Sequence, residues 1–224
     1  MNILVVSPHP DDETLGCGGA LLYHKNKGDN IYWLNITNIS HSKGWSKVKV
    51  EKRRKEISKV KEIYGFTNSF DLKFATTELD TVPMSKIIND ISEIYNIVKP
   101  EIIFAPYNYD VHTDHKIVFK ALSSTFKWFR HPYIKSVLLY ETLSETDFNF
   151  LNSFTPNTFI NISDFFDKKI QIMNIYESEI KEFPFPRSEK SIQALAALRG
   201  SQSGFAYAEA FQLIYQKYEW KNKS

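Results

Sequence analysis

The first half of the chain alternates short apolar runs with longer segments in which apolar residues recur at helical spacing, and this alternation constrains the fold most. A short apolar run between turn residues is typical of a strand buried on both faces, and the longer segments predict helices that cover those faces. Strands are expected over residues 3–6, 31–36, 70–74, 101–105 and 136–140. Helices are expected over residues 14–27, 47–64, 84–98 and 114–128. The alternation predicts an α/β fold with a mostly parallel sheet.

The remainder of the chain is less regular. Residues 163–182 and 189–200 are expected to be helical, and residues 206–214 to form a final strand. No repeat of fixed period and no low-complexity linker divides the sequence. Residues 1–224 are therefore predicted to form a single domain, which is within the usual size of an α/β domain.

Composition narrows the choice of partners and compartment. A net charge of +2 gives no general attraction to polyanions, and the basic stretch 47–61 fits the solvated face of a helix, so no nucleic-acid partner is expected. Cys17 is the only cysteine, which excludes an intrachain disulfide and fits a reducing compartment. The N-terminus lacks the apolar core of a secretory signal and no apolar run could span a bilayer, so a cytoplasmic protein without an integral membrane segment is expected.

The first predicted strand runs directly into the sequence His-Pro-Asp-Asp-Glu at residues 9–13. Two prolines stiffen this turn and aim its side chains. A catalytic metal site needs about three protein ligands and an open position for water, and His9 and Asp12 can supply two of them. Asp11 is then free to act as a general base. In the alternative interpretation, Asp11 and Asp12 only cap the next helix, which does not explain a histidine between two prolines.

The strand over 101–105 leads to a second cluster, Asp-Val-His-Thr-Asp-His at residues 110–115. Because the carboxyl ends of parallel strands lie at one edge of a sheet, both clusters are expected to meet there. One of the two histidines could complete the metal site, and the other, as an imidazolium, could stabilise an oxyanion or protonate a leaving amine. Asp110 and Asp114 are candidates to orient one histidine each. A solvated loop with a helix cap is the alternative.

The two clusters resemble the signature of the PIG-L (LmbE-like) N-acetylglucosaminyl deacetylase family, whose motifs are His-Pro-Asp-Asp-Glu and His-x-Asp-His. Further matching stretches are residues 14–19, Arg53-x-x-Glu56 in the helix that ends at Gly65, and residues 199–200 leading to 207–211, so the resemblance covers nearly the whole chain. It implies a Rossmann-like three-layer sandwich. It also implies removal of the acetyl group from an N-acetylglucosamine-type conjugate, a small amino-sugar substrate.

The resemblance assigns a role to each motif residue. The residues that resemble the zinc ligands are His9, Asp12 and His115, with another divalent metal such as Fe²⁺ as the alternative. Asp11 resembles the general base, and His112 resembles the oxyanion stabiliser and acid that Asp114 tunes. The proline common in the second motif is replaced by Thr113, and Asp110 stands where some members carry a tyrosine that contacts the intermediate. Some relatives assemble, so a homo-oligomer is also considered.

Substrate contacts are expected from several further positions. Arg53 and Arg199 are candidates to bind an anionic part of the substrate, because guanidinium pairs well with carboxylate and phosphate, and an internal ion pair is the alternative for each. Asp110 is a third candidate contact. The segments 38–45 and 183–187 are candidate lids or sugar walls.

Two smaller features have competing interpretations. Trp45 either stacks on a sugar ring or is an ordinary, partly buried aromatic residue. The glycine-rich residues 16–19 lack the spacing of a dinucleotide-binding loop, so they are expected to allow close packing of helix on sheet or approach of the substrate. Cys17 is expected to be a small buried residue, with a role as fourth metal ligand as the alternative.

Two rival functions remain open from the residues alone. Two histidines and a carboxylate also form the iron site of non-haem oxygenases. A metal-stabilised sugar-binding module without catalysis is the other alternative, although pure binding needs neither Asp11 nor His112.

Overall fold

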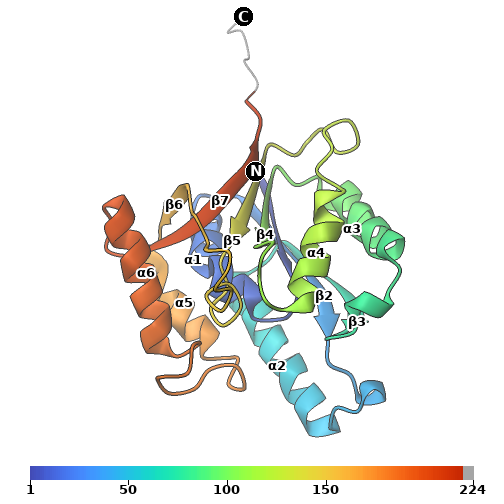
Figure 1. Ribbon diagram of the computed structural model, residues 1–224, viewed down its shortest axis with the longest axis horizontal. Coiled ribbons are helices and arrows are strands. Elements are labelled where there is room, and N and C mark those ends of the chain that lie inside the picture. The colour runs from blue at the N-terminus through green and yellow to red at the C-terminus, as the bar shows by residue number, and fades with distance from the viewer. Residues whose placement is uncertain (219–224) are drawn as a thin grey trace, which may run out of the picture.

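The computed structural model describes residues 1–218 and shows a sheet covered by helices on both faces (Figure 1). The strands are β1 (Asn2–Ser7), β2 (Asn30–Asn38), β3 (Asn68–Ala75), β4 (Ile102–Pro106), β5 (Ser136–Tyr140), β6 (Thr158–Asn161) and β7 (Ala208–Gln216). The helices are α1 (Asp12–Asn26), α2 (Lys47–Tyr64), α3 (Met84–Val98), α4 (Thr113–Ser123), α5 (Phe166–Met173) and α6 (Glu189–Ser203). The predicted α/β class with a mostly parallel sheet is confirmed.

The seven strands have the order β3-β2-β1-β4-β5-β7-β6. The five from β3 to β5 run parallel, whereas β7 is antiparallel to both β5 and β6. β1 lies directly beside β4, with Ile3 opposite Ile102. The two polar clusters of the sequence therefore follow neighbouring strands at the same edge of the sheet.

The period of two along β1 sends its side chains into two separate cores. Ile3 and Val5 pack with residues of α1, α2, α5 and α6. Leu4 and Val6 pack with residues of α3 and α4 on the opposite face. All four side chains are fully buried, as expected of a central strand in a three-layer fold.

The C-terminal third differs from the sequence-based expectation. The helix expected over residues 163–182 is limited to α5 and a preceding 3₁₀ turn, Ser163–Phe165. After α5 the chain turns so that the buried hydroxyl of Tyr176 donates a hydrogen bond of 2.9 Å to Glu13, and this contact favours turns over a continued helix. The final strand was expected, but its antiparallel partner β6 was not.

α1 is interrupted at Cys17, whose φ of −147° is not helical. The interruption leaves backbone groups without helical partners, and two buried side chains form hydrogen bonds with these groups. Glu209 accepts hydrogen bonds from the backbone N–H groups of Gly19 and Ala20, at 2.8 and 2.7 Å. Lys169 donates to the Leu15 carbonyl at 2.9 Å and to Glu209 at 2.7 Å. The break is thus stabilised by an ion pair between α5 and β7.

Gly16 lies where α1 comes closest to the sheet. A Cβ atom there would lie 2.2 Å from the ring of Tyr140, whose hydroxyl donates to the Val6 carbonyl at 2.8 Å. The expected close packing of helix on sheet is therefore present. Cys17 is fully buried beside it, in agreement with its expected role as a small core residue.

None of the helices within residues 1–218 combines the length and apolar character that crossing a membrane requires.

Candidate functional site

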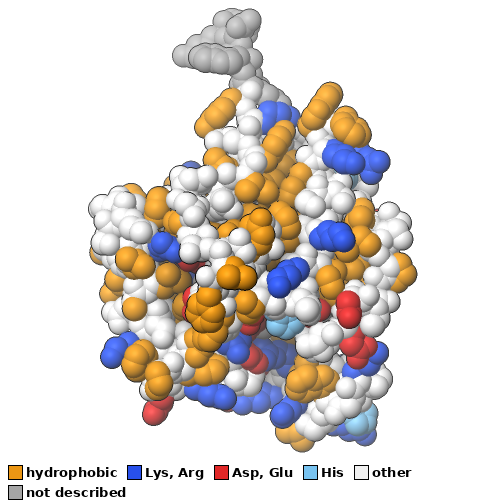
Figure 2. Space-filling model, viewed as in Figure 1, with side chains coloured by type: hydrophobic (Ala, Val, Ile, Leu, Met, Phe, Trp, Pro, Cys, Tyr) orange, Lys and Arg blue, Asp and Glu red, His pale blue; other side chains and the backbone are white. Residues whose placement is uncertain are grey.

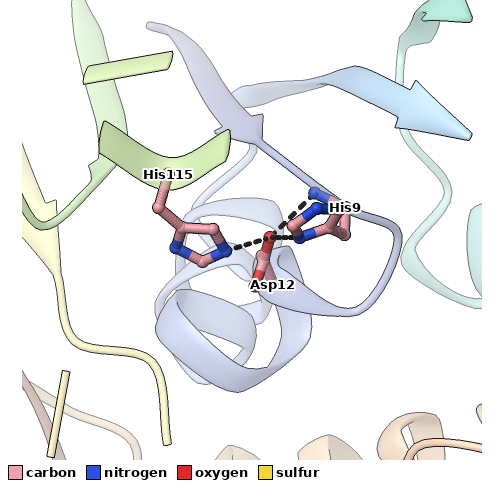
Figure 3. Close-up of side chains that lie close together, drawn as sticks. All are labelled: His9, Asp12 and His115. Atoms are coloured by element: carbon pink, nitrogen blue, oxygen red, sulfur yellow. Dashed lines mark hydrogen bonds and ion pairs between the residues drawn. The ribbon is translucent and has the colours of Figure 1, made fainter. Parts of the chain in front are cut away.

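Three potential metal ligands meet at the carboxyl edge of the sheet. His9 lies in the turn between β1 and α1, Asp12 is the first residue of α1, and His115 lies in the first turn of α4 (Figure 3). One nitrogen or oxygen atom from each lies within 4.8 Å of the others. The structure thus brings together the three residues that the resemblance assigns as metal ligands, over a separation of more than 100 positions.

Each histidine of this group is oriented by a carboxylate behind it. His115 Nδ1 lies 2.8 Å from Asp110, which also accepts a hydrogen bond of 2.6 Å from the Thr146 hydroxyl. His9 Nε2 lies 3.0 Å from Asp114. These contacts leave His115 Nε2 and His9 Nδ1 facing the same oxygen of Asp12, at 3.3 and 3.5 Å. Such outer carboxylates fix the ring orientation and raise the basicity of metal-ligating histidines.

The donor set fits a divalent metal. His115 Nε2 is buried and faces the Asp12 oxygen at 3.3 Å but makes no well-formed hydrogen bond among the described residues, an arrangement that a metal bound between the two atoms would satisfy. Two imidazole nitrogens and one carboxylate oxygen suit zinc, and iron(II) as well. Burial lowers the pKa of His9, but hydrogen bonds to Asp114 and Asp12 outweigh it and raise that pKa to about 9. A bound metal takes the place of this proton.

Asp11 is buried beside the metal ligands but points elsewhere. Its carboxylate accepts a hydrogen bond of 3.1 Å from Arg187, and its backbone N–H donates to Glu13 at 3.0 Å. Burial raises the pKa of Asp11, the Asp12 carboxylate adds to the rise, and Arg187 opposes it. A carboxyl with a raised pKa is suited to accept a proton and to hold it until it is transferred.

His112 caps the N-terminus of α4. Its Nδ1 accepts the backbone N–H of Asp114 at 3.1 Å, so a proton on the neutral ring lies on Nε2. Burial, and then the positive charges of His9 and His115, lower the pKa of His112 to about 4. In the metal-free protein the ring is therefore neutral at pH 7 and can donate a hydrogen bond from Nε2, whereas the expected imidazolium of the metal-loaded enzyme stays a prediction. The carboxylate of Asp114, which the resemblance assigns to the tuning of His112, is hydrogen-bonded to His9, and its negative charge also acts to raise the pKa of His112.

A cavity of about 460 Å³ opens over these residues. One wall is formed by α2 and the segment before it, with Trp45 and Arg53. The facing walls come from the loop after β5, with Glu145, and from residues 178–187. Both segments expected as lids or walls, residues 38–45 and 183–187, therefore contribute lining residues. Trp45 is partly exposed, and Lys49 lies over its ring at 5.6 Å.

The three candidate substrate contacts have different positions. Arg53 lines the cavity, donates to the Pro10 carbonyl at 3.1 Å and is paired with Glu179. Arg199 lies outside the cavity, and its guanidinium makes two hydrogen bonds of 2.7 and 2.6 Å with Glu141. It therefore corresponds to the alternative of an internal ion pair.

Asp110 also requires a correction as a substrate contact. It is fully buried behind His115, both of its oxygens are hydrogen-bonded, and it does not line the cavity. Its contacts are those of a residue that orients a histidine.

Two residues at the site were not identified from the sequence. Glu13 accepts hydrogen bonds from Asp11, Thr14 and Tyr176, and burial raises its pKa to about 7. Its place at the end of the first motif was an available signal. Arg187 lies in the expected wall segment, but no sequence signal pairs it with Asp11, which is 176 positions away.

Comparison with known proteins shows related sequences and folds. The sequence model of one protein family, described as GlcNAc-PI de-N-acetylase (PIG-L), matches residues 4–126. A diacetylchitobiose deacetylase from Thermococcus kodakarensis is 25% identical over 230 residues, covering 95% of this chain and 82% of that protein. The conserved protein TT1542 from Thermus thermophilus superposes with a TM-score of 0.77 at 25% identity, with 99% of each chain covered. N,N'-diacetylchitobiose deacetylase from Pyrococcus horikoshii gives a TM-score of 0.74 at 23% identity, covering 95% of this chain and 83% of that one.

Proposed function

We propose that this chain, which belongs to the PIG-L family of GlcNAc-PI de-N-acetylases, is a metal-dependent N-deacetylase. It hydrolyses the acetamide of an N-acetylglucosamine-type conjugate to a free amine and acetate, with zinc as the metal and another divalent ion such as Fe²⁺ as the alternative. One observation carries the proposal. The buried Nε2 of His115, a nitrogen of His9 and an oxygen of Asp12 face one another within 4.8 Å, in a cavity that Asp11 also lines.

The proposed chemistry divides between the metal and two side chains. When bound, a divalent ion polarises the acetyl carbonyl and lowers the pKa of a nearby water molecule. Asp11 accepts a proton from that water as it attacks the carbonyl carbon. His112 donates its Nε2–H to the oxygen on which negative charge develops. Asp11 then returns the proton to the nitrogen as the C–N bond breaks, and a protonated His112 is the alternative donor.

The first test is acetate release from a panel of N-acetylglucosamine conjugates by the zinc-loaded protein. Asp11→Asn keeps the size of the side chain but cannot accept the proton, so we expect turnover to fall by roughly 10²–10⁴-fold with zinc content unchanged. Asp12→Asn is expected to lose the metal as well. Asp90→Asn, on the surface of α3, is the matched control. Wild-type turnover in Asp11→Asn would remove the assignment of the base.

The same preparation tests the rival functions. The site has the donor set of a non-haem iron oxygenase, so oxygen uptake by the Fe²⁺-loaded protein without acetate release would favour that alternative. Binding of the conjugates with neither reaction would favour a non-catalytic sugar-binding module. Acetate release without oxygen uptake is the result that we expect.

Proposals also follow for the ligand, the cellular location and the oligomeric state of the enzyme. A small amino-sugar conjugate is the proposed partner, and no nucleic acid is expected. A cytoplasmic location and assembly into a homo-oligomer remain predictions from the sequence and from the resemblance.

A further inference from the structure

Five carboxylates line the catalytic cavity, and one of them forms no ion pair within residues 1–218. The five are Asp11, Asp12, Glu56, Glu145 and Glu179. All except Glu145 are paired with neighbouring arginine or histidine side chains. The proposed deacetylation does not use the Glu145 carboxylate, so its role is open.

The carboxylate of Glu145 is accessible from the cavity and weakly held. Its Oε1 accepts a hydrogen bond of 3.3 Å from the Ser144 hydroxyl, and its Oε2 has no hydrogen-bond partner in the part of the chain that the structure describes. Unlike both oxygens of Glu56, this Oε2 is not shielded from solvent. Burial of the side chain raises the pKa of Glu145, His115 opposes the rise, and Asp12 adds to it. A ligand in the cavity can therefore reach an acceptor oxygen whose charge is poorly solvated.

The turn that carries Glu145 is tied to the metal site. Ser144, which precedes it, has a φ of 75°, and such a strained backbone persists only where surrounding contacts hold it. Thr146, which follows it, donates a hydrogen bond of 2.6 Å to Asp110, and Asp110 orients His115. The position of Glu145 relative to the metal ligands is therefore fixed by the fold.

This turn lies at the opening of the cavity. In Figure 2, histidine and acidic side chains are visible at the surface between the lower end of α4 and the loop that follows β5, in the orientation of Figure 1. The wall with Glu145 faces the wall that α2 and Trp45 form. A substrate whose acetamide lies at the metal site therefore lies between these two walls.

An amino sugar carries donors that suit this carboxylate. An ionised carboxylate only accepts hydrogen bonds, and its bonds from hydroxyl groups are roughly twice as strong as those between neutral groups. In a glycoside, carbon 1 bears the aglycone, so the hydroxyl on carbon 3 is the one nearest to the acetamide on carbon 2. A cationic ligand is less favoured, because four Lys and Arg side chains and the metal ligands line the same cavity.

We propose that Glu145 is a specificity-determining residue, and that its carboxylate accepts a hydrogen bond from the hydroxyl on carbon 3 of the amino sugar. The inference rests on the proposed deacetylase function. It explains how the cavity distinguishes a sugar from other acetamides, which the metal and Asp11 alone cannot do.

The test compares the methyl glycoside of N-acetylglucosamine with its 3-deoxy analogue. The wild-type protein is expected to deacetylate the 3-deoxy analogue with a kcat/KM about tenfold or more below that for the parent glycoside, which corresponds to about 1.4 kcal/mol. Equal values for the two glycosides would overturn the proposal.

Three variants test whether Glu145 is the source of this preference. Glu145→Ala is expected to reduce the ratio of the two kcat/KM values to nearly one, mainly through a higher KM for the parent glycoside. Glu145→Gln keeps an acceptor oxygen and should retain part of the preference. Glu93→Ala removes an exposed carboxylate of α3 outside the cavity and should retain all of it.

The opposite outcomes are equally clear. A full preference in Glu145→Ala, or an equal loss in Glu93→Ala, would contradict a hydrogen bond from Glu145 to the sugar. A Glu145→Gln variant with no more preference than Glu145→Ala would mean that the residue acts by its charge alone, and it would contradict the proposal as well.

Binding separates this proposal from the deacetylase function. Calorimetric titration of the metal-free protein with the two glycosides needs no turnover. Tighter binding of the parent glycoside, lost in Glu145→Ala, would support the role of Glu145 even if no acetate were released. Equal binding of both glycosides to the wild-type protein would exclude that role even if deacetylation were established.

Discussion

Asp11 combines an unusual backbone with a fixed side chain. Its φ is 138°, in the region that favours glycine, and such strain persists only where surrounding contacts hold it. The carbonyl of Asp11 accepts the N–H groups of Thr14 and Leu15, at 3.0 and 2.9 Å, and its own N–H is bonded to Glu13. Arg187 holds the carboxylate. The strained turn aims Asp11 away from Asp12, so that Asp12 can bind the metal while Asp11 accepts a proton.

Replacement of Arg187 is expected to change the pKa of Asp11 but not the binding of the metal. Arg187 lowers the pKa of Asp11 against the effect of burial, so in Arg187→Ala that pKa rises further. The base must be ionised, and the acidic limb of the kcat profile should therefore move to higher pH, with kcat at pH 7 reduced by roughly tenfold or more. Zinc content should not change. Arg187→Lys should restore part of the shift, and an unmoved profile in Arg187→Ala would contradict this role.

Metal binding is expected to release protons. The pKa of His9 is raised to about 9 in the metal-free protein, so the ring is protonated at pH 7 and must lose that proton to bind zinc. Calorimetric titration with zinc in buffers of different ionisation enthalpy should give about one proton or more released per ion. Asp114→Asn removes the largest contribution that raises this pKa and should reduce the release. An apparent enthalpy that is the same in every buffer would contradict the prediction.

At the scale of elements, regular segments could be predicted and irregular ones could not. The boundaries of α2 and α3 follow from helical spacing, and α2 ends where Gly65 adopts a φ of 59°. The helix expected over residues 114–128 stops at Ser123, and the Thr125 hydroxyl bonds to the Leu122 carbonyl at 2.7 Å. Side-chain hydrogen bonds of this kind compete with the backbone hydrogen bonds of a helix, but they do not change the spacing of apolar residues along the sequence. Sequence spacing therefore overestimates the length of such helices.

The pair of Arg199 in α6 and Glu141 after β5 is expected to stabilise the fold and to leave substrate binding unaffected. Both side chains are about nine-tenths buried. Arg199→Ala leaves the Glu141 carboxylate buried without its partner, so we expect a loss of about 3–5 kcal/mol in the free energy of unfolding. Urea denaturation measures this loss. KM for the conjugates should be unchanged, and a raised KM at full stability would return Arg199 to the candidate substrate contacts.

A double replacement tests the mechanism of this stabilisation. Arg199→Leu/Glu141→Leu removes both charges, and apolar residues of similar size often replace a buried pair at little cost. Its stability should be closer to that of the wild type than to that of Arg199→Ala. A double variant as unstable as Arg199→Ala would indicate that packing, not charge, is the main contribution.

At the scale of the whole molecule, the site is assembled by the sheet. The meeting of the two motifs could be predicted, because β1 and β4 are parallel and adjacent and their carboxyl ends lie at one edge. The wall formed by residues 174–188 could not, because its contact from Arg187 to Asp11 depends on turns that have no periodic signal. The hydrogen bond of Asp114 to His9 could not be predicted either, since it depends on side-chain direction and not on spacing.

A metal held by His9, Asp12 and His115 would join the turn after β1 to α4, and zinc should therefore stabilise the whole fold. An ion that binds only the folded state adds about 4 kcal/mol at a concentration roughly 1,000 times its Kd. Because 1 kcal/mol corresponds to roughly 2–4 °C in a domain of this size, we expect zinc to raise the Tm by about 8–16 °C. Differential scanning calorimetry with zinc and with a chelator measures the shift.

Two variants separate the metal ligand from the base. Asp12→Asn should abolish the shift in Tm, whereas Asp11→Asn should keep it, because Asp11 takes part in the reaction and does not bind the metal. A shift that is lost equally in both variants would mean that the two carboxylates bind the ion together, and the division of roles between them would have to be abandoned.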